Sequence, residues 1–181
     1  MILVALGANL PGPAGAPRAQ LAAALAELDR AGVHVKRVSR LWRTPAWPDP
    51  AEPSFLNAVA VVETSLPPAA LLALLHAVEA RLGRRRGRAN APRPIDLDLI
   101  DHDGLVTRDG AAPVLPHPRV GERAFVLLPL ADVAPCWRHP VSGCGLRDLI
   151  AALPPDATAE PLEEAGEGTG AERCGAGDPG L

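Results

Sequence analysis

The order of apolar segments along this chain predicts an α+β fold of the ferredoxin-like type, a βαββαβ antiparallel sheet with helices packed on it. Four short apolar runs have the length and composition of strands and lie at residues 2–6, 33–42, 58–62 and 95–100. Segments with leucines at helical spacing connect the first run to the second and the third to the fourth. Two later apolar segments, 125–133 and 146–153, predict additional C-terminal helices.

Glycine and proline mark the ends of the expected elements. The first helix should end near Gly32, because glycine is common at the position after a helix. The second helix should begin at Pro67 and Pro68, since proline is tolerated in the first turn, and it should end at Gly83. The proline-rich segment 44–53 favours a long loop before the third strand.

The distribution of acidic residues divides the chain into a domain and a tail. The whole chain carries a net charge of -3, and residues 156–181 hold seven acidic residues and one arginine. That segment is poor in aliphatic residues, which is typical of sequences that cannot bury enough apolar surface to fold. We therefore predict one folded domain at 1–154 and an acidic, disordered tail at 155–181.

Charge and hydropathy exclude several functional classes. The arginines are concentrated between Arg81 and Arg93, which favours a small anionic ligand over the extended basic surface that nucleic acid requires. No apolar run approaches the length of a membrane span, and no signal-peptide pattern opens the chain. The three cysteines lack paired spacing and should be reduced thiols. We expect a cytoplasmic monomer that binds neither nucleic acid nor membrane.

Two carboxylates alternate with two leucines at the start of the fourth strand, in Asp96-Leu97-Asp98-Leu99. Strand alternation sends both carboxylates to one face of the sheet. Magnesium prefers such oxygen ligands together with water and substrate phosphates, so the pattern predicts a metal site that is completed by a nucleotide. For this tetrapeptide alone, acids on a solvated strand face are the simpler alternative.

A cluster of arginines precedes this strand on a loop that contains glycine and proline, at Arg84, Arg86, Arg88 and Arg93. Guanidinium groups neutralise phosphate charge during phosphoryl transfer, so cations next to metal ligands favour that chemistry. A solvated basic face is the alternative. His117 lies between two prolines on another loop and is a candidate donor to a phosphate oxygen, with a structural hydrogen-bonding role as its alternative.

The two phenylalanines of the chain both lie beside polar residues. Phe55 and Asn57 are two positions apart at the start of the third strand and share a face, and Phe125 begins a predicted helix. A flat heterocycle would stack between two such rings, while an amide side chain matched its polar edge. Packing in the core is the alternative for each ring taken alone.

Further motifs accompany these residues in order: Leu6-Gly7-Ala8-Asn9-Leu10, Arg43-Thr44-Pro45, Phe55-Leu56-Asn57-Ala58, Glu63-Thr64, Glu79 with Gly83-Arg84, 92–98, Pro116-His117-Pro118 and 123–126. As a set, over residues 2–150, they closely resemble the 6-hydroxymethyl-7,8-dihydropterin pyrophosphokinase family. The resemblance implies transfer of pyrophosphate from ATP to that pterin alcohol in folate biosynthesis, by attack of its hydroxymethyl oxygen on the β-phosphorus, with AMP leaving.

The resemblance also implies roles for individual residues. Asp96 and Asp98 would hold two magnesium ions and form the catalytic group together with Arg84 and Arg93. The pterin pocket would contain Thr44, Pro45, Trp47, Phe55, Asn57, Arg123 and Phe125. The ATP site would contain His76, Glu79, Arg84, Arg93, Leu99 and His117.

Three departures from the family pattern and two rival functions bear on these expectations. Ala8 stands where serine is common, Asn90-Ala91 where many members have Trp-Gly, and Pro118 where some members have an aromatic residue. A nucleotide-sensing module would bind ATP without an acceptor pocket, because fold alone does not decide function. A metal-dependent phosphohydrolase would release AMP or phosphate without any pterin.

Overall fold

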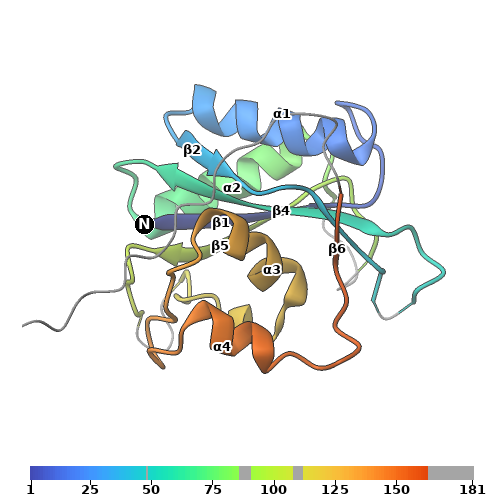
Figure 1. The fold of residues 1–181 in the computed structure, drawn as a ribbon. Helices are drawn as coiled ribbons and strands as arrows, with labels where there is room; N and C mark the ends of the chain where they lie inside the picture. The colour runs from blue at the N-terminus through green and yellow to red at the C-terminus, as the bar shows by residue number, and fades with distance from the viewer. Residues whose placement is uncertain (48, 86–90, 108–111, 163–181) are drawn as a thin grey trace, which may run out of the picture.

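The computed structural model describes residues 1–47, 49–85, 91–107 and 112–162. Its main elements are β1 (Ile2–Ala8), α1 (Pro17–Arg30), β2 (His34–Val38), β3 (Trp42–Thr44), β4 (Phe55–Glu63), α2 (Pro68–Arg81), β5 (Asp96–His102), α3 (Ala124–Val133), α4 (Leu146–Ala151) and β6 (Glu160–Pro161). A short 3-10 turn, Val120–Glu122, precedes α3. This order confirms the predicted βαββαβ core, followed by two additional helices (Figure 1).

The strands form one antiparallel sheet in the order β5-β1-β4-β3-β6, and β2 also pairs with β4. The strand after α1 thus lies beside β4, while β5 joins the far side of β1, as the ferredoxin-like arrangement requires. Gly32 and Gly83 follow α1 and α2 with φ angles of 81° and 88°. Both glycines therefore end their helices as predicted.

The single strand predicted at 33–42 is divided into β2 and β3. Between them Ser39 leaves the regular ladder, although its backbone N–H still donates to Val59 O at 2.9 Å. Its hydroxyl accepts from the N–H of Val59 at 3.0 Å and donates to Arg40 O at 2.8 Å. The side chain of Ser39 therefore replaces a strand hydrogen bond, which explains why the apolar pattern continues through an interruption of the backbone.

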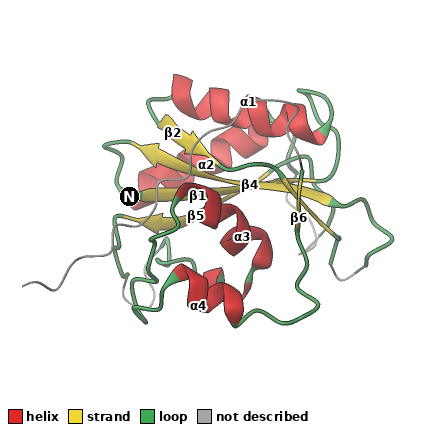
Figure 2. Ribbon diagram, viewed as in Figure 1, coloured by secondary structure: helices red, strands yellow, loops and turns green. Residues whose placement is uncertain are grey.

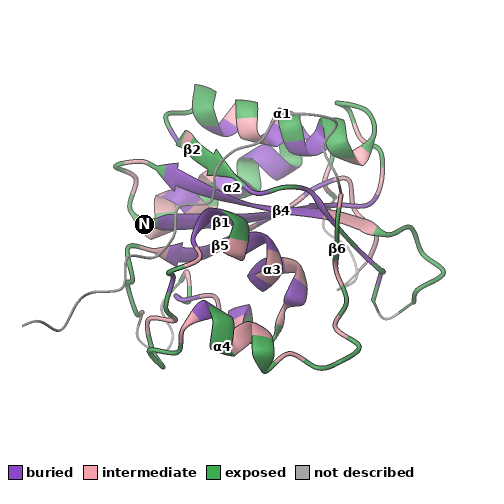
Figure 3. Ribbon diagram, in the orientation of Figure 1, coloured by how far each residue is buried: buried purple, intermediate pink, exposed green. Residues whose placement is uncertain are grey.

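The sheet is the middle layer of three, with α1 and α2 on one face and α3 and α4 on the other (Figure 2). Alternate residues of each central strand enter two separate cores, and the central strands are buried on both faces (Figure 3). In β1, Val4 and Leu6 pack under α1 and α2, whereas Leu3 and Ala5 pack under α3. The face that carries α3 is the one on which the polar residues of the site gather.

Residues 155–162 belong to the predicted disordered tail but lie against the domain. Glu160–Pro161 form β6, the N–H of Leu162 donates to Leu41 O at 2.7 Å, and the Leu162 side chain packs on the core under α1 and α2. These contacts form because β3 offers an open edge and Leu162 has apolar surface to bury. Residues 163–181 lie outside the described residues.

Two other expectations concern cysteine and membranes. Cys144 is free and exposed, but Cys136 is disulfide-bonded, so the prediction of reduced thiols is wrong for Cys136. Among the helices in the described part of the chain, none combines the length and the apolar character needed to cross a bilayer.

Candidate active site

The register of the strands brings several strand ends together on one face of the sheet. Gly7, near the end of β1, lies opposite both Asn57 of β4 and Asp96 of β5. Thr44, at the end of β3, lies opposite Phe55 at the start of β4. Residues two apart on a strand share a face, so these polar and aromatic side chains lie on the same side as the strand residues that pack under α3.

A cavity of about 360 Å³ opens above this part of the sheet. Its floor is the end of β1, and its walls come from β3 and the loop after it, β4, β5, the start of α3 and the segment after α4. The lining residues are Ala5, Leu6, Gly7, Thr44, Pro45, Ala46, Trp47, Phe55, Asn57, Arg93, Asp96, Asp98, Arg119, Glu122, Arg123, Ala124, Phe125, Asp156, Ala157 and Thr158.

Asp96 is held by two arginines of the preceding loop. Arg84 Nη1 contacts Asp96 Oδ1, and Arg93 Nη2 lies 2.8 Å from Asp96 Oδ2. Arg84 also contacts Glu79 of α2, whose carboxylate accepts from the N–H of Leu97 at 2.7 Å. Burial raises the pKa of Glu79, although the hydrogen bond from Leu97 and the charge of Arg84 oppose this effect.

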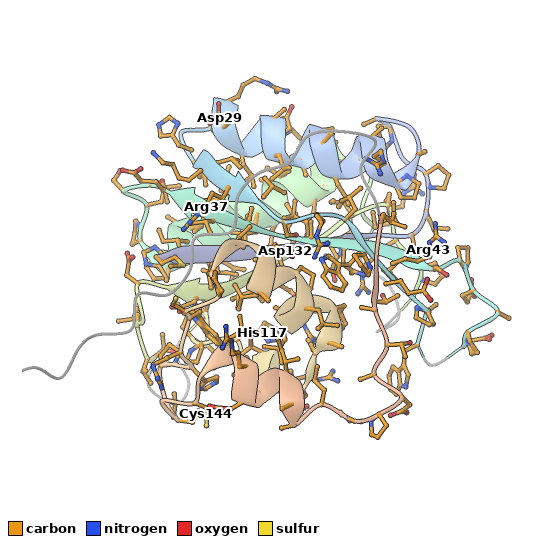
Figure 4. The ribbon with its side chains drawn as sticks, viewed as in Figure 1. Asp29, Arg37, Arg43, His117, Asp132 and Cys144 are labelled. Atoms are coloured by element: carbon orange, nitrogen blue, oxygen red, sulfur yellow. The ribbon has the colours of Figure 1, made fainter. Side chains whose placement is uncertain are left out.

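Asp98 is held by a third arginine, Arg123, at the N-terminus of α3. Arg123 Nη1 lies 2.9 Å from Asp98 Oδ2, and His117 Nε2 lies 4.0 Å from the same oxygen on the α3 side of the sheet (Figure 4). Burial lowers the pKa of His117, Asp98 partly opposes this, and Arg123 and Arg119 lower it further. His117 Nδ1 accepts from the N–H of Arg119 at 3.2 Å, and Arg123 Nη1 lies 3.5 Å from His117 Nε2.

The cavity also contains two half-buried aromatic rings, each stacked under a guanidinium group. Arg93 Cζ lies 5.4 Å from the ring centroid of Phe55, and Arg123 Cζ lies 5.4 Å from that of Phe125. Cation–π contacts of this kind fix the orientation of both partners. Each of these arginines therefore touches both a carboxylate and an aromatic ring. They join two parts of the site: a charged half, made of Asp96, Asp98 and the arginines bound to them, and an aromatic half, made of Phe55 and Phe125.

The amide of Asn57 is buried and oriented at the bottom of the cavity. Its Nδ2 donates to Thr44 Oγ1 at 2.9 Å, which ties β4 to β3. Trp47, on the loop after β3, has a different environment, because 69% of its surface is exposed at the cavity rim. A large apolar side chain in this position has surface to bury when a ligand enters.

Asn9, which follows β1, connects the loops that approach the cavity from two sides. Its Nδ2 donates to Pro53 O at 2.9 Å, and its Oδ1 accepts from the N–H of Arg93 at 2.8 Å. The Asn9 side chain is buried, and both hydrogen bonds are partly buried. Sequence patterns assigned this residue only a place in a motif, since both of its partners are backbone groups far away in the chain.

Most of the predicted site residues lie together. Those on the cavity wall are Thr44, Pro45, Trp47, Phe55, Asn57, Arg93, Asp96, Asp98, Arg123 and Phe125. Arg84 and His117 adjoin it through Asp96 and Asp98, and Glu79 adjoins Arg84 behind β5. His76 is exposed on α2 and Leu99 is buried in the core, so neither side chain lines the cavity. Arg86, Arg88 and Asn90 lie outside the described residues.

The acidic residues of the site do not form a complete metal centre. Among the described residues, no group of three or more His, Cys, Asp or Glu side chains is arranged to hold a metal ion. Asp96 and Asp98 supply carboxylate oxygens from two positions of one strand. A hard cation bound there would need its other ligands from water or from a bound substrate, which is the coordination that magnesium favours.

A sequence model of the 7,8-dihydro-6-hydroxymethylpterin-pyrophosphokinase (HPPK) family matches residues 3–135. The chain belongs to this family. An HPPK relative from Methylorubrum extorquens, a 2-amino-4-hydroxy-6-hydroxymethyldihydropteridine pyrophosphokinase, is 40% identical over 151 residues, which cover 83% of this chain and 91% of the relative. A pyrophosphokinase of the same name from Pseudomonas aeruginosa is 39% identical over 154 residues, covering 84% of this chain and 91% of its own.

The fold is also similar to that of solved structures whose names contain HPPK. The wild-type HPPK-DHPS protein of Plasmodium falciparum superposes with a TM-score of 0.60 at 14% sequence identity. The match covers 83% of this chain but 44% of that longer chain. At this identity the likeness establishes the fold, and the HPPK assignment rests on the family match and the close relatives.

Proposed function

We propose that the cavity binds 6-hydroxymethyl-7,8-dihydropterin and that the adjoining arginines and carboxylates bind ATP with two magnesium ions. The chain is an HPPK, an ATP-dependent diphosphotransferase of folate biosynthesis. The observation that carries the residue assignment is the position of Arg93 and Arg123, which each contact one carboxylate and one cavity ring. These contacts support the assignment, because they bring guanidinium groups, which bind phosphate well, to the edge of a cavity with aromatic walls.

The reaction joins the hydroxymethyl oxygen of the pterin to the β-phosphorus of ATP. The bond between that phosphorus and the oxygen bridging it to the α-phosphate breaks, AMP leaves with the bridging oxygen, and the attacking hydroxyl loses its proton. Phosphoryl transfer of this kind depends mainly on positioning and on neutralising charge. No side chain needs to be assigned as a general base.

Asp96 and Asp98 fit the metal that this reaction implies, because both are carboxylates on one face and the site leaves the remaining ligands to phosphate and water. Bound magnesium supplies Lewis-acid neutralisation of phosphate oxygens. The chain's own cations act beside it. Arg93 Nε is buried and has no hydrogen-bond partner among the described residues, so it is a donor that a phosphate oxygen would satisfy.

The aromatic half of the site suits a flat ring with polar edges. Phe55 and Phe125 offer ring faces, and Asn57 offers an amide whose orientation is fixed by Thr44. Trp47 gains buried surface when the pocket fills. We propose that His117 Nε2, which lies beside Asp98 and Arg123, donates to a phosphate oxygen when ATP is bound. We assign His76, Glu79 and Leu99 no direct contact through their side chains with a pterin in the cavity.

A coupled assay for AMP release tests the proposal. The protein should release AMP from magnesium ATP only when the dihydropterin alcohol is present, with the pterin diphosphate formed in equal amount. Release of AMP or phosphate without the pterin would indicate a phosphohydrolase, and ATP binding without turnover would indicate a nucleotide-sensing module. Titration of magnesium binding with a non-hydrolysable ATP analogue present should give two ions per site.

The oligomeric state and the compartment are further proposals. We propose a monomer in the cytoplasm, and the use of ATP as co-substrate supports that compartment. Light scattering of the purified protein across a range of concentrations should give the mass of one chain. A mass that rises to that of a dimer would contradict this assignment.

A further inference from the structure

The segment after α4 returns to the sheet at β6 (Figure 1), and three of its residues line the cavity. Asp156, Ala157 and Thr158 line the cavity on its outer side, together with the loop that carries Trp47. A turn holds these three residues in shape: the N–H of Ala157 donates to Pro154 O at 3.0 Å, and that of Thr158 donates to Asp156 O at 2.9 Å. The backbone here is thus a defined wall and not an extended linker.

The same segment is anchored immediately beyond the wall. β6 pairs with β3, with Trp42 opposite Pro161 and Arg43 opposite Glu160. The next residue, Leu162, donates its N–H to Leu41 O at 2.7 Å and packs its side chain on the core. Without β6, one edge of the three-residue strand β3 would be open.

The strand that β6 covers is the one that orients the pocket. Thr44 at the end of β3 accepts the hydrogen bond that fixes Asn57, and the chain continues from Thr44 directly to Pro45 and Trp47 on the rim. Any displacement of β3 therefore moves both the amide at the bottom of the cavity and the loop at its mouth. β6 pairs with β3, whereas the charged half of the site is built on β5 and the start of α3.

We propose that residues 155–162 complete the acceptor pocket, by presenting 156–158 as the wall that limits the size of the entering ring and by fixing β3 through β6. The inference rests on the proposed function of the cavity and assigns a role to a segment beyond the family match, which ends at residue 135. The segment is a specificity and positioning element for the pterin, and it leaves the nucleotide site independent.

The decisive variant keeps the whole chain and fills the pocket from this wall. Ala157→Trp places a large side chain on the lining, and Ala152→Trp, on the exposed residue after α4, is the matched control. Ala157→Trp should raise the KM for the dihydropterin about tenfold or more, because overfilling a packed site commonly costs the free energy of such a factor. The Kd of Ala157→Trp for a non-hydrolysable ATP analogue with magnesium should equal that of the wild type. The matched control, Ala152→Trp, should have the KM values of the wild type for both substrates.

Two further variants test the anchor. Leu162→Pro deletes the donor to Leu41 O and should raise the KM for the pterin while leaving that for ATP unchanged. Leu162→Met keeps both the donor to Leu41 O and an apolar side chain of similar volume, and should leave both KM values unchanged. If Ala157→Trp melts below Ala152→Trp, the smaller Ala157→Leu takes its place.

Unaltered pterin KM in a folded Ala157 variant, or equal weakening of both substrates, would overturn the inference. A failure of the proposed function would appear elsewhere, in the wild type, which would then release no AMP with the pterin.

Discussion

Gly7 of β1 leaves just enough room for the amide of Asn57 on β4. A Cβ atom at position 7 would lie 3.2 Å from Asn57 Oδ1, 3.8 Å from Phe55 Cδ1 and 3.9 Å from Asp96 Cβ. The first of these distances is shorter than ordinary van der Waals contact, and Asn57 cannot easily move because its Nδ2 donates to Thr44. The floor of the cavity is therefore shaped by the absence of a side chain.

Substitution of this glycine should damage pterin binding first. Gly7→Ala should raise the KM for the pterin about tenfold, as expected for an overpacked site, and should affect the KM for ATP much less. Ala5→Gly, on the same face of β1, is a control that removes a lining atom and adds none. Steady-state kinetics with each substrate varied in turn would measure this, and an unchanged pterin KM in Gly7→Ala would contradict it.

The two carboxylates of β5 should be essential for turnover and not for folding. Asp96→Asn and Asp98→Asn keep the size of each side chain but remove its charge, so turnover should fall by about a hundredfold or more. Asp103→Asn, an exposed residue that follows β5, is the matched control and should retain activity. The measurement is AMP release with magnesium in excess, and near wild-type rates in both site variants would remove the metal assignment.

The rings of Phe55 and Phe125 should contribute to the affinity for the pterin and not to the affinity for the nucleotide. Phe55→Leu and Phe125→Leu keep apolar volume but lose the ring face, which is worth about 0.5–1.5 kcal/mol beyond burial, so pterin affinity should drop by roughly tenfold. Calorimetric titration with a pterin analogue measures the loss, and titration with an ATP analogue is the control. Equal loss of both ligands in a folded variant would show that the rings are core residues.

The side chain of Asn9 should influence the binding of both substrates, because it bonds to the loop at Pro53 and to the backbone of Arg93. Asn9→Ala removes both partly buried hydrogen bonds, to Pro53 O and from the N–H of Arg93, and should lower the free energy of unfolding by about 1–3 kcal/mol. Asn9→Asp keeps the acceptor for Arg93 and loses the donor to Pro53. The alanine variant should therefore raise the KM for both substrates, and the aspartate variant chiefly that for the pterin; identical kinetic profiles would refute this division.

Glu79 should give stability an unusual pH dependence. Its pKa is raised in the folded protein by burial, so above the ordinary glutamate pKa of about 4.5 the folded state holds this proton more tightly than the unfolded state. The contribution of Glu79 to the free energy of unfolding therefore decreases as the pH rises through this window. Relative to the wild type, Glu79→Gln should become more stable as the pH rises above about 4.5.

The matched control for this titration is Glu63→Gln. The pKa of Glu63 is lowered by its contacts with Lys36, so its contribution is present above the ordinary pKa and is lost as the pH falls. Urea unfolding at a series of pH values, with each variant compared to the wild type, should give trends of opposite sign. Parallel trends would contradict the assignment for Glu79.

Local patterns predicted most of the site, and long-range pairing accounts for what they missed. The alternation of Asp96 and Asp98 with leucines is a property of one strand, so it was visible in the sequence. Glu79 continues the four-residue repeat of Leu71 and Leu75 on α2, and that spacing was an available signal for its burial. The position of Leu99 in the core follows equally from alternation with Asp98.

Other features had no local signal. β6 has two residues, one of them proline, and forms because β3, more than a hundred positions earlier, has an edge to cover. The two hydrogen bonds of the Asn9 side chain join backbone groups that lie far from it in the sequence. Composition alone assigned residues 155–162 to the acidic tail. Each of these contacts depends on tertiary proximity, which the periodicity of a single segment does not contain.

The resting site carries its own counterions. Asp96 and Asp98 are neutralised by Arg84, Arg93 and Arg123 before any ligand arrives. If the proposed site is right, a divalent cation alone would take the carboxylates and leave Arg93 and Arg123 without a carboxylate partner, while Arg84 would keep Glu79. A nucleotide alone would take the guanidinium groups and leave two carboxylates exposed to phosphate. The two together would give each of these charges a new partner. On that proposal, the resting protein is matched to the metal–nucleotide complex as a single ligand, and each component would promote the binding of the other.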